Sequence, residues 1–82
     1  MSRLPRDISG DELIRSLRRY DYESTRQTGS HVRLTRTTTE GQQHLTVPRH
    51  RSLRVGTLNS ILGAVAVHIG KSKDEVVVEL FG

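Results

Sequence analysis

The sequence of 82 residues contains no cysteine, no tryptophan and one phenylalanine, and only 33% of it is hydrophobic. The lack of cysteine excludes disulfides, thiolate metal sites and a cysteine nucleophile. Long apolar runs are also absent, since the longest, Ile61–Val67, is interrupted by Gly63 and is far too short to span a bilayer. Met1–Asp7 lacks the apolar region of a signal peptide. We therefore expect one cytoplasmic domain over residues 1–82, without membrane contact and with residues 1–8 as a flexible N-terminus.

Acidic residues are scarce in the middle of the chain, and this determines where the positive charge lies. The net charge is +4, but residues 1–25 are balanced and residues 55–82 carry −1, so residues 26–54 hold a surplus of +5. That segment has six arginines against Glu40 alone. Arginine suits phosphate because its donors form a planar fork. A basic stretch can also be a merely solvated face. Here the surplus is local and interleaved with histidines, which favours a polyanionic partner.

A helix followed by three strands is predicted for the first half of the chain. Ser9 and Glu12 have the spacing of a capping box, and apolar residues follow at helical intervals, which predicts a helix from about Ser9 to Arg19. Strands are expected at Tyr22–Gln27, at His31–Thr38, and from the turn at Glu40-Gly41 to Pro48. Alternation in the second and third strands gives the meander one apolar and one polar, basic face. The apolar face should carry Val32, Leu34, Leu45 and Val47, and the open face His31, Arg33, Thr35, Thr37, His44 and Thr46.

Two further helices are predicted after the meander. The first should open at Gly56-Thr57, with Thr57 as its N-cap, and end at Gly70. Ser72-Lys73-Asp74-Glu75 is a second capping box. The three valines that follow favour a strand, but we expect a short helix ending at Phe81. Helix, meander, helix is the order of the double-stranded-RNA-binding fold. The expected fold class is α+β, a double-stranded-RNA-binding-domain-like α-β-β-β-α sandwich with a short extra C-terminal helix.

Four histidines, His31, His44, His50 and His68, are candidates for acid–base chemistry. Histidine suits RNA cleavage without a metal, because its reference pKa of about 6.5 lets it take the 2′-OH proton before the oxygen attacks the neighbouring phosphate. His31 follows Gly29-Ser30, a turn where a substrate backbone can approach closely and amides can bind phosphate. His44 shares the open face but belongs to no motif, and core packing is expected for His68. No His-x-x-x-His pair is present, so no metal site is expected.

Three short motifs carry a resemblance to a known family: Gly29-Ser30-His31, Val47-Pro48-Arg49-His50, and Gly56-Thr57-Leu58 with Ile61-Leu62. With these motifs in this order, the chain resembles the HicA family of toxins over Ser9–Phe81. Those toxins are small ribonucleases of toxin–antitoxin pairs that cleave mRNA, and the histidine of their Gly-Ser-His motif is catalytic. The resemblance therefore implies that His31 is catalytic and that a HicB-type antitoxin covers the active face. Asp21-Tyr22 departs from the family pattern, where a glycine–aromatic pair is frequent.

The resemblance and the charges together define the expected site, with His31 as its catalytic residue. Arg26 and Arg33 should neutralise charge that builds on the phosphorane. The helix start at Gly56-Thr57 offers free amides to a phosphate. His50 either supplies a proton to the leaving 5′-oxygen or only binds phosphate. The expected RNA-binding residues are Arg26, Gly29, Ser30, Arg33, Arg49, His50, Arg51, Arg54, Gly56 and Thr57.

The expected partners are mRNA and a HicB-type antitoxin, without a metal or another cofactor. A homodimer and a toxin–antitoxin hetero-oligomer both remain open. The function expected is that of an endoribonuclease toxin, an mRNA interferase that acts by histidine-dependent, metal-independent transesterification. The alternative is a non-catalytic RNA-binding module of the same fold, and a weaker one is a scaffold for an acidic protein partner. Only His31 separates the first two, because a binder needs no imidazole at that turn.

Overall fold

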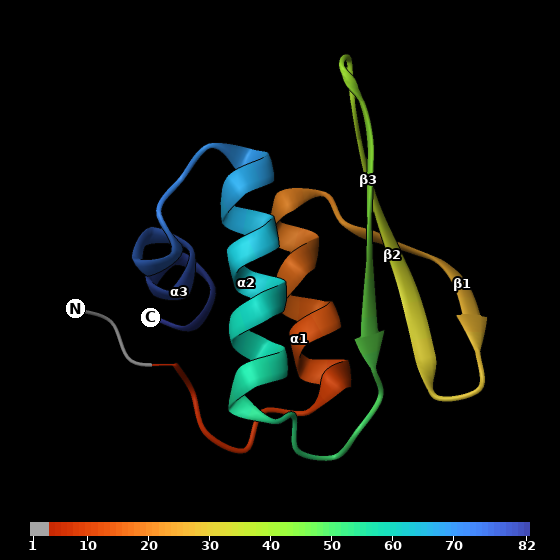
Figure 1. The fold of residues 1–82 in the computed structure, drawn as a ribbon, viewed down its shortest axis with the longest axis vertical. Coiled ribbons are helices and arrows are strands. Elements are labelled where there is room, and N and C mark those ends of the chain that lie inside the picture. The colour runs from red at the N-terminus through yellow and green to blue at the C-terminus, as the bar shows by residue number, and fades with distance from the viewer. Residues whose placement is uncertain (1–3) are drawn as a thin grey trace.

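One antiparallel sheet lies against two layers of helices, as Figure 1 shows edge-on to the sheet. The computed structural model describes residues 4–82. The elements in chain order are α1 (Gly10–Leu17), the 3₁₀ helix η1 (Arg18–Tyr20), β1 (Glu23–Thr28), β2 (His31–Thr38), β3 (Gly41–Pro48), α2 (Val55–Ile69) and α3 (Lys73–Phe81). This arrangement confirms the predicted α+β order, a helix, three strands and a helix, with an extra C-terminal helix.

The strands pair as a meander in the order β1-β2-β3, and the register fixes which side chains share a face. Leu34 lies opposite Leu45, and Val32 lies opposite Val47. All four side chains are buried toward the helices, as the alternation predicts. A bulge near Thr25 shifts the pairing of β1 with β2. The edge strand β1 is exposed along its whole length.

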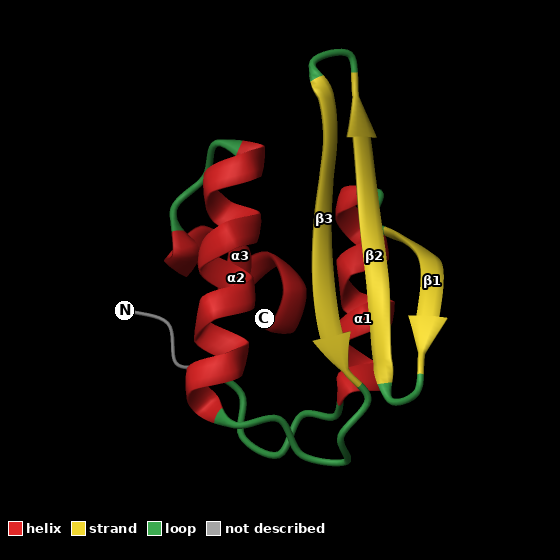
Figure 2. Ribbon diagram, turned by 45° about the vertical axis from the view of Figure 1, so that its right-hand side comes forward, coloured by secondary structure: helices red, strands yellow, loops and turns green. Residues whose placement is uncertain are grey.

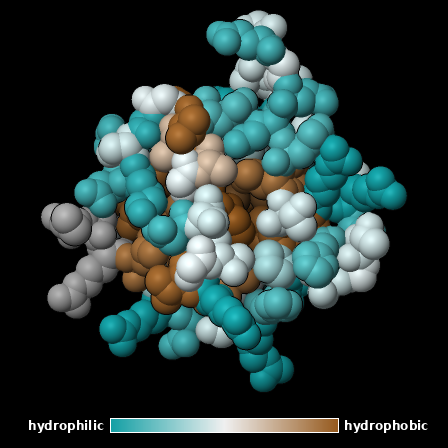
Figure 3. Space-filling model, viewed as in Figure 1, coloured by the Kyte–Doolittle hydropathy of each residue, from teal (hydrophilic) through white to brown (hydrophobic). Residues whose placement is uncertain are grey.

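The helices cover one face of the sheet and leave the other open. Helices α1 and α2 contact β3, and α3 packs against α1 and α2 on the side away from the sheet (Figures 1 and 2). In Figure 3 the brown, hydrophobic residues gather between these layers, whereas the margin formed by the sheet is teal to white. The fully buried side chains are Leu13, Leu17, Tyr22, Leu34, Val47, Leu58, Leu62, Val65 and Val76.

Side-chain caps set the start of α1 and of α3 as predicted. The Glu12 backbone N–H donates to Ser9 Oγ at 3.0 Å, and the Ser9 N–H donates to Glu12 Oε1 at 3.1 Å. The same reciprocal pair joins Ser72 and Glu75 at the start of α3. The capping box therefore outweighs the strand propensity of the valines that follow it.

The predicted start of α2 at Gly56-Thr57 is wrong. The helix begins at Val55, its N-cap is Arg54, and no side chain caps its first turn. The reason is tertiary: Leu53 is buried, and its N–H donates to the Ile8 carbonyl at 2.8 Å, so the loop is anchored just before the helix turns. The predicted C-cap is confirmed, since Gly70 takes the left-handed conformation with φ +74°.

The end of the segment before α1 contributes to the core. Of the segment 1–8 expected to be flexible, residues 1–3 lie outside the described residues, but Ile8 is 5% exposed and belongs to the core. The first helix also ends as a 3₁₀ turn over Arg18–Tyr20 rather than as α-helix to Arg19. No helix within residues 4–82 has both the length and the apolar character needed to cross a lipid bilayer.

Candidate functional site

The open face of the sheet carries a shallow cavity built entirely from strand side chains. Its volume is about 460 Å³. None of the six lining residues is acidic, and two are arginines and two are histidines. The lining residues are Arg26, Thr28, His31, Arg33, His44 and Thr46. The predicted open face thus contains a concave basic site.

A two-residue turn places His31 at the rim of this cavity. Thr28 pairs with His31, so only Gly29 and Ser30 connect β1 to β2. Gly29 has φ +58° and Ser30 does not have a positive φ, the pattern expected of a type II′ turn with glycine first. The Ser30 carbonyl accepts a hydrogen bond of 2.6 Å from the Arg49 N–H, which ties the turn to the end of β3. The Gly-Ser-His motif therefore presents an exposed imidazole from a fixed hairpin end.

The arginines of the site lie in one row across the sheet. Arg26 pairs with Arg33, and Arg33 pairs with Thr46 on the other side. Both arginine side chains are exposed. Like charges at directly paired positions repel each other, and none of the residues lining the cavity is acidic. The row is suited to binding a phosphate.

A chain of threonine hydroxyls connects His44 to the sheet beneath the cavity. Thr35 was expected on the open face and lies there, yet it is only 7% exposed and is the one buried polar residue of the described chain. Its Oγ1 is 2.9 Å from His44 Nδ1 and 2.8 Å from Thr25 Oγ1. The sequence showed His44 on this face through strand alternation, but no motif pointed to it. The hydroxyl chain could not be foreseen, because it depends on the register of three strands and a bulge.

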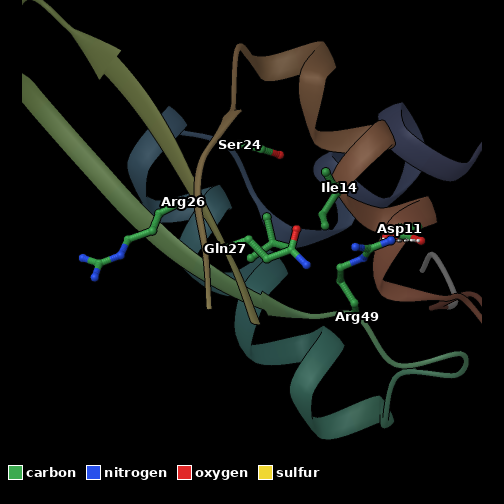
Figure 4. Close-up of a pocket in the computed structure, with 7 residues that line it drawn as sticks. Asp11, Ile14, Ser24, Arg26, Gln27 and Arg49 are labelled. Carbon is green, nitrogen blue, oxygen red and sulfur yellow. Dashed lines mark hydrogen bonds and ion pairs between the residues drawn. The ribbon is translucent and has the colours of Figure 1, made fainter. Parts of the chain in front are cut away.

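Arg49 lies on the other side of β1, in a second cavity between the sheet and α1. Figure 4 shows its guanidinium bound to the Asp11 carboxylate; Arg26 also lines this cavity, but its side chain extends away from Asp11 and Arg49. Arg49 Nε is 2.8 Å from Asp11 Oδ1, and its Nη2 is 3.2 Å from Asp11 Oδ2. The hydrogen bonds from Arg49 hold the pKa of Asp11 below its usual value. Arg49 is therefore paired with an acid rather than free on the open face.

The other expected binding residues are located in the loop after β3 and at the start of α2. His50, Arg51 and Arg54 are exposed in or at the end of this loop, and none of them lines the cavity that holds His31. The loop is fixed at its base, since the His50 carbonyl accepts from the Gly10 N–H at 2.9 Å. In Figure 1 the loop, the start of α2 and the β1–β2 turn all lie at the same end of the molecule. The structure thus brings Arg26, His31 and Arg33 together in one cavity. The remaining predicted residues lie outside that cavity.

The fourth histidine is in neither the core nor the cavity with His31. His68 was expected to pack in the core, but it is half-buried and its Nδ1 is 3.1 Å from Arg36 Nη1. Arg36 faces the helices beyond the last apolar pair of the sheet, and its Nε donates to the Tyr20 carbonyl at 2.8 Å. The Arg36 guanidinium is therefore hydrogen-bonded within the fold and does not belong to the open face. Within residues 4–82 no three histidine or carboxylate side chains gather as a metal site would require.

Comparison with known proteins gives one match. A family model described as "HicA toxin of bacterial toxin-antitoxin" matches residues 10–67, from the first residue of α1 through most of α2. The matched region includes the whole sheet and leaves out α3. No curated protein and no solved structure matches the chain significantly.

Proposed function

We propose, from the premise that this chain belongs to the HicA family of toxins of bacterial toxin–antitoxin systems, that it is an endoribonuclease that cleaves mRNA in the cytoplasm. The observation that carries the proposal is the basic cavity on the open face, where His31 and the Arg26–Arg33 row line one concave surface. The family match covers every residue of that cavity. The proposed reaction is a transesterification that needs histidine and no metal ion.

His31 is the proposed general base. A ring nitrogen of His31 takes the proton of the 2′-OH, and the 2′-oxygen attacks the adjacent phosphorus. The guanidinium groups of Arg26 and Arg33 stabilise the negative charge that grows on the phosphorane oxygens. The Gly29-Ser30 turn has no side chain at its first position, so an RNA backbone can approach the imidazole closely.

The loop after β3 is the proposed extension of the RNA-binding surface. Arg51 and Arg54 are exposed, and His50 stands beside them. Backbone amides of Gly56 and Thr57 lie in the first turn of α2, where the helix dipole favours an anion. These groups would bind phosphates flanking the cleaved one. Arg49 would contribute least, because Asp11 already pairs with it.

A HicB-type antitoxin is the proposed partner. Inhibition requires only that an acidic surface cover the cavity, since the cavity is open and lacks negative charge of its own. An RNA oligonucleotide and the antitoxin should then compete for the same face. The assembly proposed is a toxin–antitoxin hetero-oligomer.

Replacement of His31 by alanine tests the proposal. Cleavage of a model mRNA should fall by about 10²–10⁴-fold, the usual contribution of a general base. Thr37→Ala is the matched control, because Thr37 is also exposed on β2 and shares the face of His31 outside its cavity. Circular dichroism should show the same fold for both variants. Growth arrest on expression should disappear only with His31→Ala.

The products and the metal requirement test the chemistry. Cleavage should persist in EDTA and leave a 2′,3′-cyclic phosphate, and a 2′-deoxy sugar at the cleaved position should abolish it. Undiminished cleavage by pure His31→Ala protein would refute the assignment of His31. Loss of activity in EDTA, restored by Mg²⁺, would refute the metal-free reaction. RNA binding without cleavage by the wild-type protein would instead favour a binding module.

A further inference from the structure

Two histidines stand on opposite sides of the arginine row on the open face. His31 is opposite Thr28 at the start of β2, and His44 is opposite Thr35 in the middle of β2 and β3. Arg33 lies between the two levels, opposite Thr46. A step of two residues along a strand is about 7 Å, so each histidine is one such step from the arginine row. A phosphate bound at the row therefore has one imidazole on each side.

The hydroxyl chain beneath the cavity can hold the charged form of the His44 ring. In an imidazolium both ring nitrogens carry a hydrogen, and the Nδ1–H of His44 can donate to Thr35 Oγ1, 2.9 Å away. Thr35 can then donate its own hydrogen to Thr25 Oγ1 at 2.8 Å, and Thr25 Oγ1 lies 3.4 Å from the Arg33 carbonyl oxygen. With Nδ1–H held by Thr35, Nε2 is the nitrogen of His44 that can give a proton to a substrate.

We propose that His44 is a second catalytic residue, the general acid that protonates the leaving 5′-oxygen. The inference rests on the proposed ribonuclease function and assigns the role for which the sequence offered only His50. His44 lines the same cavity as His31, whereas His50 lies in the loop outside it. An in-line displacement places the attacking 2′-oxygen and the leaving 5′-oxygen on opposite sides of phosphorus. The two imidazoles flank the arginine row in the same way.

The proposed step moves two protons. His31 accepts the 2′-OH proton as the 2′-oxygen forms its bond to phosphorus. The bond from phosphorus to the 5′-oxygen breaks, and that oxygen takes the proton from Nε2 of the His44 imidazolium. The products are a 2′,3′-cyclic phosphate and a 5′-OH end, with His31 protonated and His44 neutral. The Thr35 hydroxyl accepts from Nδ1–H before and after the transfer, so the ring keeps its orientation.

The test uses a short RNA containing the site that the wild-type protein cleaves, made with either oxygen or sulfur at the bridging 5′ position. A thiolate leaves without a proton, because the pKa of a thiol is about 8.5, far below that of an alcohol. On the oxygen substrate His44→Ala should cleave about 10²–10⁴-fold more slowly than wild type. On the sulfur substrate it should cleave within a few-fold of wild type. His31→Ala should be slow on both, since the 2′-OH proton must still be removed.

Two further variants control for position and for folding. Thr37→Ala alters an exposed residue of the same face that lines neither this cavity nor the one beside it, and should leave both rates unchanged. Thr35→Val removes the acceptor for Nδ1–H and should slow only the oxygen substrate, by about tenfold or more, the worth of a hydrogen bond to a charged group. Thr35→Ser keeps the hydroxyl and should restore the rate.

The outcomes separate this inference from the proposed function. If His44→Ala cleaves the oxygen substrate at the wild-type rate, or is slowed equally on both substrates, His44 is not the acid, although the ribonuclease function stands. If instead His50→Ala cleaves the oxygen substrate slowly but the sulfur substrate at nearly the wild-type rate, the acid is His50 and the inference is wrong. Wild-type protein that cleaves neither substrate refutes the proposed function, and the role of His44 falls with it.

Discussion

Asp11 masks one arginine of the proposed RNA-binding surface, so its removal should strengthen RNA binding. Among the six arginines of residues 26–54, Arg36 is hydrogen-bonded to Tyr20 and His68, and Arg49 is paired with Asp11. The other four make no ion pair within the described part of the chain. These four are Arg26, Arg33, Arg51 and Arg54.

The magnitude follows from counterion release. Each phosphate neutralised on a single strand contributes about 0.7 to the slope of log K against log salt, so four free arginines predict a slope of about −2.8. Asp11→Asn frees Arg49 and should steepen the slope to about −3.5. Arg51→Ala should flatten it to about −2.1, whereas Arg49→Ala should leave it near −2.8. From the sequence alone, Arg49 and Arg51 would be expected to contribute equally.

Fluorescence anisotropy measures these slopes with a labelled RNA that carries a 2′-deoxy sugar at the cleaved position. Titrations over about 50–200 mM KCl cover the range in which such slopes are linear. The Asp11–Arg49 pair is exposed on both sides, so its loss should change stability little. Equal flattening by Arg49→Ala and Arg51→Ala, or an unchanged slope in Asp11→Asn, would refute the masking of Arg49. A slope near zero for the wild type would refute the basic face as an RNA site.

Two predictions concern the fold that holds the site. Gly10→Ala should destabilise the protein by about 1–3 kcal/mol in chemical denaturation, because a Cβ there would lie 2.0 Å from the Pro48 carbonyl oxygen. A Cβ at Gly63, inside α2, would meet nothing within 4 Å, so Gly63→Ala should stabilise the protein by about 0.5–1 kcal/mol. Equal effects of the two substitutions would contradict this geometry. The pKa of Tyr20 is raised to about 12, mainly because the side chain is partly buried and secondly because its hydroxyl donates a hydrogen bond to Glu79 of α3. Because unfolded tyrosine ionises near 10, stability should be retained up to about pH 10 and lost as the pH rises toward 12. Absorbance titration of Tyr22→Phe protein checks this, and a Tyr20 pKa near 10 would contradict it.

The sequence by itself determined the features that depend on neighbours along the chain. The capping boxes at Ser9 and Ser72 specified two helix starts, because the side chain and the amide it accepts are three residues apart. Alternation in β2 and β3 determined the buried and the open face, since successive strand residues point to opposite sides. The Gly29-Ser30 turn and the place of His31 after it followed from the same short range. The family resemblance then supplied the catalytic expectation for His31.

Only the tertiary structure decided which of the chemical groups meet. The start of α2 moved to Val55 because Leu53 is anchored to a segment before α1. Arg49 is paired because α1 brings Asp11 beside the end of β3. His44 is hydrogen-bonded to Thr35 because the β2–β3 register puts the two residues opposite each other, and a bulge in β1 lets Thr25 contact Thr35 as well. Each of these contacts joins residues far apart in sequence, and their distance depends on packing and strand register, which no local pattern encodes.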